Sequence, residues 1–337
     1  MIKKIFSIIC ALALIATLAA CGAPTGQNNN GQPPGGNGGE DQITIGIIQL
    51  VEHPSLTLIR TTFIEEMRNL GYDNVEFIYQ IGQPDMTLLT QIAESFVGQG
   101  VDMIVAIATM AAQAAKAVTQ AVGSDIPVIF AAATAPVQAG LVVDLNHPDA
   151  NVTGTSDIIC VESIFELAQR LTPDARTFGF VYNLGEINSV TVINNAKELF
   201  AELGFTYLEA TVTSTADVQQ AALSLVGRVD AFFTPIDNTV AAAMPVFAQV
   251  ATDAGLPIYT GADSMVMDGG FATVGIDYAI LGAETARLVS RALGGTPISQ
   301  LPVVSMQDFR TIVNRATADA LGITIDGLVE PHEIYEG

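Results

Sequence analysis

Short apolar runs alternate with amphipathic stretches along most of this chain of 337 residues. Residues 43–51 form an apolar run rich in isoleucine, which is typical of a strand buried on both faces of a parallel sheet. Residues 54–70 place their apolar side chains at helical spacing and are followed by Gly71, a residue favoured after a helix. The same reasoning predicts strands over 75–81, 103–108 and 127–132, and helices over 86–98 and 111–122.

The alternation then starts again further along the chain. Strands are predicted over 177–182, 206–210, 231–235 and 257–260, and helices over 188–203, 215–225 and 239–254. Two groups of alternating strands and helices predict an α/β fold with two doubly wound parallel-sheet lobes. Residues 151–157 (NVTGTSD), between the two groups, are predicted to form the first crossover between the lobes.

The first forty residues have a different pattern. Lys3 and Lys4 precede the apolar run 5–18, and small residues lead into Cys21. This layout is typical of a bacterial lipoprotein signal peptide over 1–20, with Cys21 becoming the lipidated first residue. A membrane span is the alternative, but the run is shorter than the roughly 20 residues that a span needs. Residues 21–42, mostly Gly, Asn, Gln and Pro, should form a flexible tether, so we expect a protein outside the cytoplasm, lipid-anchored to the cell membrane.

Composition narrows the classes of function. The formal net charge of −22 disfavours nucleic acid as a partner. With Cys10 removed and Cys21 lipidated, Cys160 would be the one cysteine left, so the mature chain could form no internal disulfide. No nucleophile elbow, HExxH, P-loop or dinucleotide motif is present in the sequence, and we expect neither a metal, a cofactor nor an enzyme.

Candidate ligand contacts follow from the position of polar residues after strands. In open parallel sheets, ligands bind beyond the carboxyl ends of the strands. The polar residues at or just beyond the predicted strand ends are Gln49, Glu52, His53, Thr109, Thr134, Asn183, Asp237, Asn238, Asp263 and Ser264.

The chemistry of these candidates suits a zwitterion such as an α-amino acid. Thr109 begins a predicted helix, whose free N–H groups and dipole attract a carboxylate. Asp237 and Asp263 belong to the other group of strands and could accept a cation. Simpler interpretations stay open: Thr109 and Asp237 could cap helices, Asp263 could hold a turn, and His53 could be an ordinary loop residue.

We therefore assign hypothetical roles to six of the candidates. The ligand carboxylate is assigned to Thr109 and Thr134, and its ammonium group to Asp237. The side-chain end of the ligand is assigned to Gln49, Glu52 and Asp263. These roles rest on strand-end position and charge.

Several motifs resemble one family of ABC-transporter substrate-binding proteins, the group labelled tryptophan/tyrosine-binding. The most specific are IGIIQLVEHPSL at 45–56 and the block PxDNT at 235–239. Weaker matches continue over nearly all of 43–325, at 105–109, 151–157, 181–183 and 275–278. One departure is Thr134-Ala135-Pro136, because relatives commonly have an aspartate after this threonine.

The resemblance implies a type I periplasmic-binding-protein fold whose chain crosses a hinge three times. The N-terminal lobe would hold residues 43–155 plus 279–303, and the C-terminal lobe 156–278 plus 304–330. A helix over 281–293 would belong to the first of these lobes, and a helix over 308–321 to the second.

The function implied is that of a solute receptor for an ABC importer. We expect a monomer that closes around an aromatic, branched-chain or other apolar amino acid and delivers it to membrane permease subunits. Two alternatives stay open: a receptor that signals to a membrane sensor, and an exported lipoprotein enzyme on the same fold.

Overall fold

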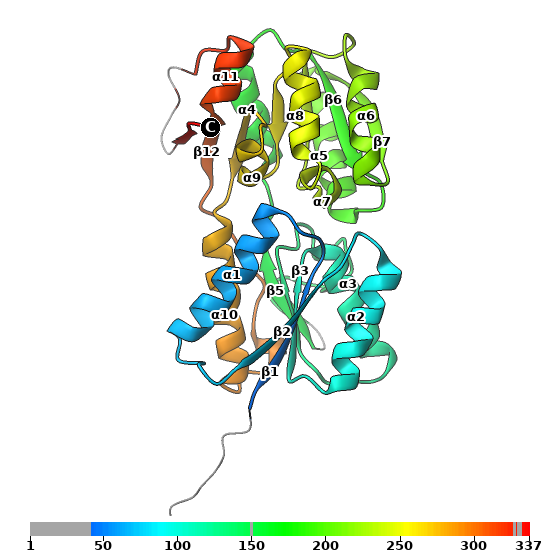
Figure 1. Cartoon of the computed structure of the whole chain (residues 1–337), viewed down its shortest axis with the longest axis vertical. Coiled ribbons are helices and arrows are strands. Elements are labelled where there is room, and N and C mark those ends of the chain that lie inside the picture. The colour runs from blue at the N-terminus through cyan, green and yellow to red at the C-terminus, as the bar shows by residue number, and fades with distance from the viewer. Residues whose placement is uncertain (1–41, 149–150, 326–327, 329–331) are drawn as a thin grey trace, which may run out of the picture. The chain divides into compact units, whose positions relative to one another are not determined.

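The computed structural model describes residues 42–148, 151–325, 328 and 332–337. The predicted signal peptide 1–20, Cys21 and the predicted tether up to Asp41 lie outside the described residues. The chain from Gln42 to Gly337 forms one compact unit, and Figure 1 draws its described residues in colour.

Six of the described strands form the first sheet. Their order is β11-β5-β4-β3-β1-β2, and every pairing is parallel. β1, β3, β4 and β5 consist entirely of buried or nearly buried residues. The apolar sequences of β1, β3 and β4 predict this burial on both faces, whereas β5 lies in the predicted crossover. The strands are β1 (Thr44–Gln49), β2 (Glu76–Ile81), β3 (Met103–Ile107), β4 (Val128–Ala131), β5 (Val152–Ser156) and β11 (Val304–Ser305).

Seven further described strands form the second sheet, in the order β13-β12-β10-β9-β8-β6-β7. Its pairings are parallel except for that between β10 and β12, which is antiparallel. The strands are β6 (Thr177–Asn183), β7 (Thr206–Val212), β8 (Ala231–Thr234), β9 (Ile258–Thr260), β10 (Ala272–Gly275), β12 (Arg310–Asn314) and β13 (His332–Tyr335).

Two helix pairs cover the first sheet (Figure 1). One pair is α1 (Pro54–Asn69) with α10 (Tyr278–Leu293), and the other is α2 (Met86–Gln99) with α3 (Thr109–Ala121). Helices α1 and α10 approach closely at Gly282, where an added Cβ would lie 2.8 Å from the carbonyl oxygen of Ile59. A short 3₁₀ helix, η2 (Ile298–Gln300), precedes β11. We call this sheet and these helices the first lobe.

The second sheet and its helices form what we call the second lobe. An aromatic cluster lies at its centre: the Phe165 ring is 4.6 Å from Phe200, 4.9 Å from Phe233 and 5.2 Å from Phe178, centroid to centroid. The helices of this lobe are α4 (Val161–Leu171), α5 (Ile187–Leu203), η1 (Thr215–Asp217), α6 (Val218–Leu225), α7 (Asn238–Ala241), α8 (Met244–Asp253), α9 (Asp263–Met267) and α11 (Arg315–Leu321).

The predicted α/β fold with two doubly wound, mainly parallel sheets is confirmed. The chain passes between the two sheets after β5, after β10 and after β11. β11 pairs with β5, so Val304 and Ser305 still belong to the first sheet. The predicted lobe boundaries stay a prediction.

Three predicted elements are wrong in detail. The helix over 308–321 is strand β12 followed by α11, because the β-branched side chains of Thr311, Ile312 and Val313 pair with β10 in the sheet. The single helix over 239–254 is two helices, α7 and α8, and Pro245 lies at the start of the second. The crossover 151–157 contains β5, which is a full strand of the first sheet.

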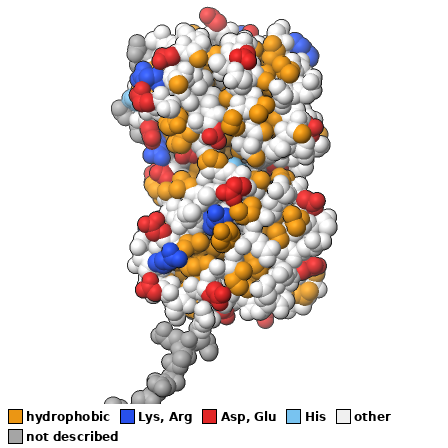
Figure 2. Space-filling model, in the orientation of Figure 1, with side chains coloured by type: hydrophobic (Ala, Val, Ile, Leu, Met, Phe, Trp, Pro, Cys, Tyr) orange, Lys and Arg blue, Asp and Glu red, His pale blue; other side chains and the backbone are white. Residues whose placement is uncertain are grey.

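The surface agrees with the acidic composition. Figure 2 shows acidic side chains scattered over the visible face, with few basic ones among them. Cys160 is a free thiol and is half-buried before α4, where Ser163 donates a hydrogen bond to its sulfur. Among the described residues, no helix is both long and apolar enough to cross a membrane.

Candidate functional site

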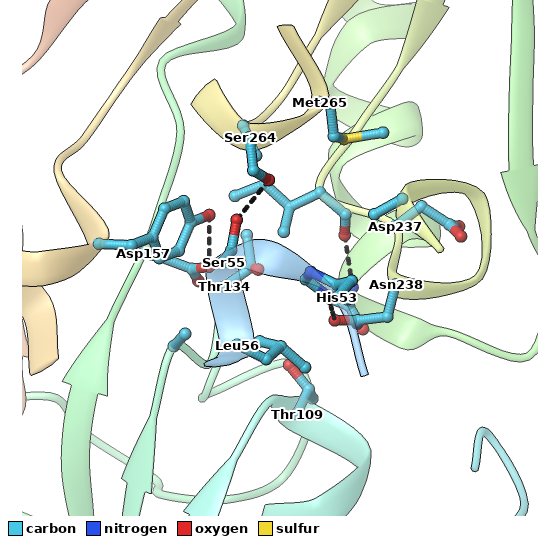
Figure 3. A pocket seen from close by; sticks show the side chains of 16 residues that line it. His53, Ser55, Leu56, Thr109, Thr134, Asp157, Asp237, Asn238, Ser264 and Met265 are labelled. Atoms are coloured by element: carbon cyan, nitrogen blue, oxygen red, sulfur yellow. Dashed lines mark hydrogen bonds between the residues drawn. The ribbon is translucent and has the colours of Figure 1, made fainter. Parts of the chain in front are cut away.

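A small cavity of about 10 Å³ lies where the strand ends of the two lobes face each other (Figure 3). This is room for about one water molecule. The first lobe contributes His53, Ser55, Leu56, Thr109, Ala132 and Thr134. Asp157 and Tyr278 flank the chain's passages between the sheets, and the second lobe contributes Asn188, Ile236, Asp237, Asn238, Ser264 and Met265.

Side chains of the two lobes bond directly to each other across this cavity. Nε2 of His53, just before α1, lies 3.2 Å from Oδ1 of Asn238 in α7. The hydroxyls of Ser55 and Ser264 share a short hydrogen bond. Both contacts are drawn as dashed lines in Figure 3. The lobes are therefore closed on each other, and their own side chains fill most of the space between them.

His53 is buried without a full set of partners. Burial lowers the pKa of its imidazole, although the bond to Asn238 and the nearby Glu186 and Glu52 oppose this shift. Its Nδ1 atom is buried and has no hydrogen-bond partner. This nitrogen is therefore a polar atom at the cavity that a ligand could satisfy.

The N-terminus of α3 forms one wall of the cavity. Its N-cap is Ala108, with a φ of 79°, and no side chain caps the first N–H groups. Ala132, after the neighbouring strand β4, has a φ of 57°, which is also uncommon for a residue other than glycine. These turns bring Thr109 and Thr134 to the cavity. An uncapped helix N-terminus with two hydroxyls beside it suits a carboxylate.

Two buried carboxylates organise the rim of the second lobe. Glu186 accepts hydrogen bonds from the backbone N–H groups of Asn238 (3.0 Å) and Thr239 (2.9 Å) and from both of their side chains. Asp237 accepts from the backbone N–H groups of Asn183 (2.6 Å) and Val240 (2.9 Å). Asp237 therefore caps α7, as the simpler interpretation of the sequence has it, and burial together with the charge of Glu186 raises its pKa.

Asp157, between β5 and α4, was not among the predicted candidates. It is fully buried, and the hydroxyl of Tyr278 donates to its Oδ2 at 3.2 Å, while its Oδ1 has no partner. Burial raises the pKa of Asp157 to about 6, although the hydroxyl groups of Tyr278 and Thr134 oppose this shift. The strand-end rule could have found Asp157 if β5 had been recognised as a strand.

The structure brings six of the ten candidates to the cavity. These are His53, Thr109, Thr134, Asp237, Asn238 and Ser264. Other lining residues missing from the prediction are Ser55, Asn188 and Tyr278. They escaped the strand-end rule because they sit at or near helix N-termini.

Four candidates do not line this cavity. Gln49 is buried beneath it and accepts a hydrogen bond from Arg60. Glu52 is exposed and accepts from Thr57. The backbone N–H of Asn183 donates a hydrogen bond to Asp237. Asp263 begins α9 and accepts a hydrogen bond from the N–H of Ser264. Burial raises the pKa of Asp263 to about 6.

The cavity residues do not form a metal cluster. Within the described parts of the chain, no group of three or more His, Cys, Asp or Glu side chains is placed to hold a metal ion. The site contains hydroxyls, amides and carboxylates around three large apolar side chains, Leu56, Ile236 and Met265. Such a set can bind a small molecule that has both charged and apolar parts.

Comparison with known proteins gives the family. Residues 44–333 match the model of the family described as ABC transporter substrate binding protein. A curated tyrosine-binding protein of Clostridioides difficile is 36% identical over 323 residues, which cover 95% of this chain and 92% of the relative.

Two solved structures extend the comparison. One, from Streptococcus pneumonia in complex with L-Trp, has 35% identity and a TM-score of 0.81 and covers 85% of this chain and 96% of its own. The other, a ligand-free, open substrate binding protein of Clostridium difficile, has 36% identity and a TM-score of 0.66 and covers 87% and 99%. With the family match over nearly the whole body, these findings show that the chain belongs to the family of ABC transporter substrate-binding proteins.

Proposed function

We propose that this protein is the receptor of an ABC importer for an aromatic amino acid, tryptophan or tyrosine. Substrate-binding proteins of ABC importers are extracytoplasmic and work with a membrane permease. The choice of ligand is supported by a relative named for tyrosine binding and by another solved with L-Trp. The predicted class of function, a solute receptor rather than an enzyme, agrees with the family.

The observation that carries the proposal is a cavity closed by side chains of both lobes. Its volume of about 10 Å³ cannot hold an amino acid. The structure is also more similar to the L-Trp complex (TM-score 0.81) than to the ligand-free, open relative (0.66), at nearly equal identity. We infer that the described state is closed, and that a ligand enters after the lobes part and then replaces their direct contacts.

The proposed ligand fits the chemistry of the cavity. Its carboxylate would bind the uncapped N-terminus of α3 beside Thr109 and Thr134. Its side chain would pack against Leu56, Ile236 and Met265, whose thioether suits contact with an aromatic ring. A branched-chain amino acid would fill the same apolar surface less completely, and is therefore the next ligand to test.

We also propose that Cys21 carries a lipid and that residues 21–42 tether the body to the membrane. The support is the sequence pattern of the first forty residues. A flexible coil of about 20 residues spans on the order of 25 Å, which would keep the receptor near its permease and free to turn. The monomeric state predicted from the family resemblance stays a prediction.

A thermal-shift screen of the full-length chain against the twenty amino acids tests the ligand. Binding raises the unfolding free energy by about 4 kcal/mol at 1,000 times Kd, so tryptophan or tyrosine should give the largest rise in Tm. Thr109→Val should lower the affinity for this ligand. Thr61→Val, on the exposed face of α1, should leave the affinity unchanged. Recovery of the unchanged ligand would separate a binding protein from an enzyme. The absence of a shift with any amino acid would overturn the proposal.

A further inference from the structure

We propose that Asp157, rather than Asp237, receives the ammonium group of the bound amino acid. This inference rests on the proposed function and assigns the residue that selects ligands with an amino group. Among the described residues that line the cavity, only Asp157 and Asp237 carry a carboxylate.

Asp237 is already satisfied by its own lobe. Each of its carboxylate oxygens accepts a backbone N–H group, one from Asn183 and one from Val240. The residue has no exposed surface. Figure 3 shows its carboxylate turned away from the labelled side chains of the first lobe. Moving it toward a ligand would leave two buried N–H groups without acceptors, which is costly.

Asp157, unlike Asp237, has a carboxylate oxygen without a hydrogen-bond partner. One oxygen is held by Tyr278, and the other lies buried at the cavity without a partner. A buried carboxylate oxygen without a partner is unfavourable unless a donor arrives. A ligand ammonium carries three N–H donors and a compensating positive charge. Its arrival would satisfy this oxygen and offset the burial of the negative charge.

The position of Asp157 also matches the geometry of an α-amino acid. β3, β4 and β5 are neighbours in the first sheet, and Thr109, Thr134 and Asp157 follow their respective ends. Adjacent strands lie about 4.8 Å apart. The three side chains therefore lie in a row at this edge of the first sheet. A carboxylate at Thr109 and Thr134 would place the ammonium group, which is bonded to the adjacent carbon, toward Asp157.

This arrangement gives the lobes different tasks. The first lobe and the connection that leaves β5 would hold both charges of the amino acid. The second lobe would supply Ile236 and Met265 to the side chain and close over it. Recognition of the amino group would therefore not require Asp237 to leave its place as the cap of α7.

The test compares an amino acid with its analogue lacking the amino group, in the full-length chain. The pairs are L-tryptophan with indole-3-propionate and L-tyrosine with 3-(4-hydroxyphenyl)propionate, measured by calorimetry at pH 7.5. The parent should prefer the amino acid by about 100-fold or more, as expected for a buried charge pair. Asp157→Asn, which keeps the side-chain shape, should lose about 100-fold for the amino acid and little for the analogue.

Asp237→Asn is the matched control. It removes the other carboxylate at the cavity and should keep the parent's preference for the amino acid, even where its stability falls. Equal affinity of Asp157→Asn and the parent for the amino acid would overturn the assignment, as would loss of the preference in Asp237→Asn. If the parent binds neither amino acid, the proposed function fails and this assignment fails with it.

Discussion

The titration of Asp157 should be visible in the stability of the ligand-free protein. Its pKa is raised from 3.8 to about 6 in the folded state, chiefly by burial. A carboxyl group with a raised pKa binds its proton more tightly when folded, so its stabilising contribution is present below pH 3.8 and is lost as the pH rises through 6. At about 1.36 kcal/mol per pH unit, the loss amounts to about 3 kcal/mol.

Asp157→Asn should therefore change the pH dependence of stability rather than simply its level. The amide does not titrate, so the unfolding free energy of the variant should gain about 3 kcal/mol on the parent between acid pH and pH 8. For a body of roughly 300 residues, with an unfolding entropy of about 2.1 cal/mol/K per residue, this corresponds to about 5 °C in Tm. Asp237 and Asp263 also have raised pKa values, but they are present in both the parent and the variant, so their contributions cancel in the comparison.

The assay is denaturant unfolding of the parent and the variant from pH 3 to pH 8 without ligand. The hydroxyl of Tyr278 opposes the raised pKa of Asp157, so removing this donor should keep the titration and move it to a higher pH. Tyr278→Phe is thus a control in which stability should still fall as the pH rises, with the fall extending to a higher pH than in the parent. Parallel stability curves for the parent and Asp157→Asn would refute the reasoning, because they would show that Asp157 titrates alike in the folded and unfolded chains.

Three further outcomes follow from the structure. Gly154→Ala should lower the unfolding free energy by more than about 4 kcal/mol, because the new Cβ would lie 2.1 Å from the Phe130 carbonyl oxygen. Gly98→Ala, on the exposed face of α2 with no atom within 4 Å, should instead stabilise the protein by about 0.5–1 kcal/mol. Denaturant unfolding measures both changes. Phe165→Ala should cost about 3–5 kcal/mol, measured the same way, since its ring packs among several others in the second lobe. Calorimetry should show amino-acid affinity falling about tenfold per pH unit below pH 6 in the parent but not in Asp157→Asn, because the ammonium requires the ionised carboxylate.

Much of the fold could be predicted from local patterns. Consecutive apolar residues mark strands that are buried on both faces, and glycines after helical runs mark the ends of helices, so most strands and helices were placed within a few residues. The helix over 308–321 was implied by the family resemblance, and its first part is the strand β12, which depends on pairing with β10 elsewhere in the sequence. The strand β5, with the polar sequence VTGTS, is buried by its neighbours rather than by its own hydrophobicity.

Part of the candidate site could also be predicted from local patterns in the sequence. Strand ends are local features of the sequence. The rule that ligands bind beyond them selected Thr109, Thr134 and four other candidates that line the cavity in the structure. Asp157 was missed together with the strand that precedes it. Gln49 and Glu52 follow a strand as well, but Arg60 and Thr57 on α1 engage them instead.

By itself, the sequence determined the class of fold, the family and the edge of the sheets where the cavity lies, because these depend on periodicity and on motifs within short stretches. Which carboxylate is available to a ligand was decided only by the tertiary structure. Asp237 and Asp157 each follow a strand in the structure, but N–H groups from residues 183 and 240 satisfy one of them, while a single tyrosine hydroxyl leaves the other with an open oxygen. Hydrogen-bond satisfaction in a buried site depends on partners that the fold assembles from distant parts of the chain.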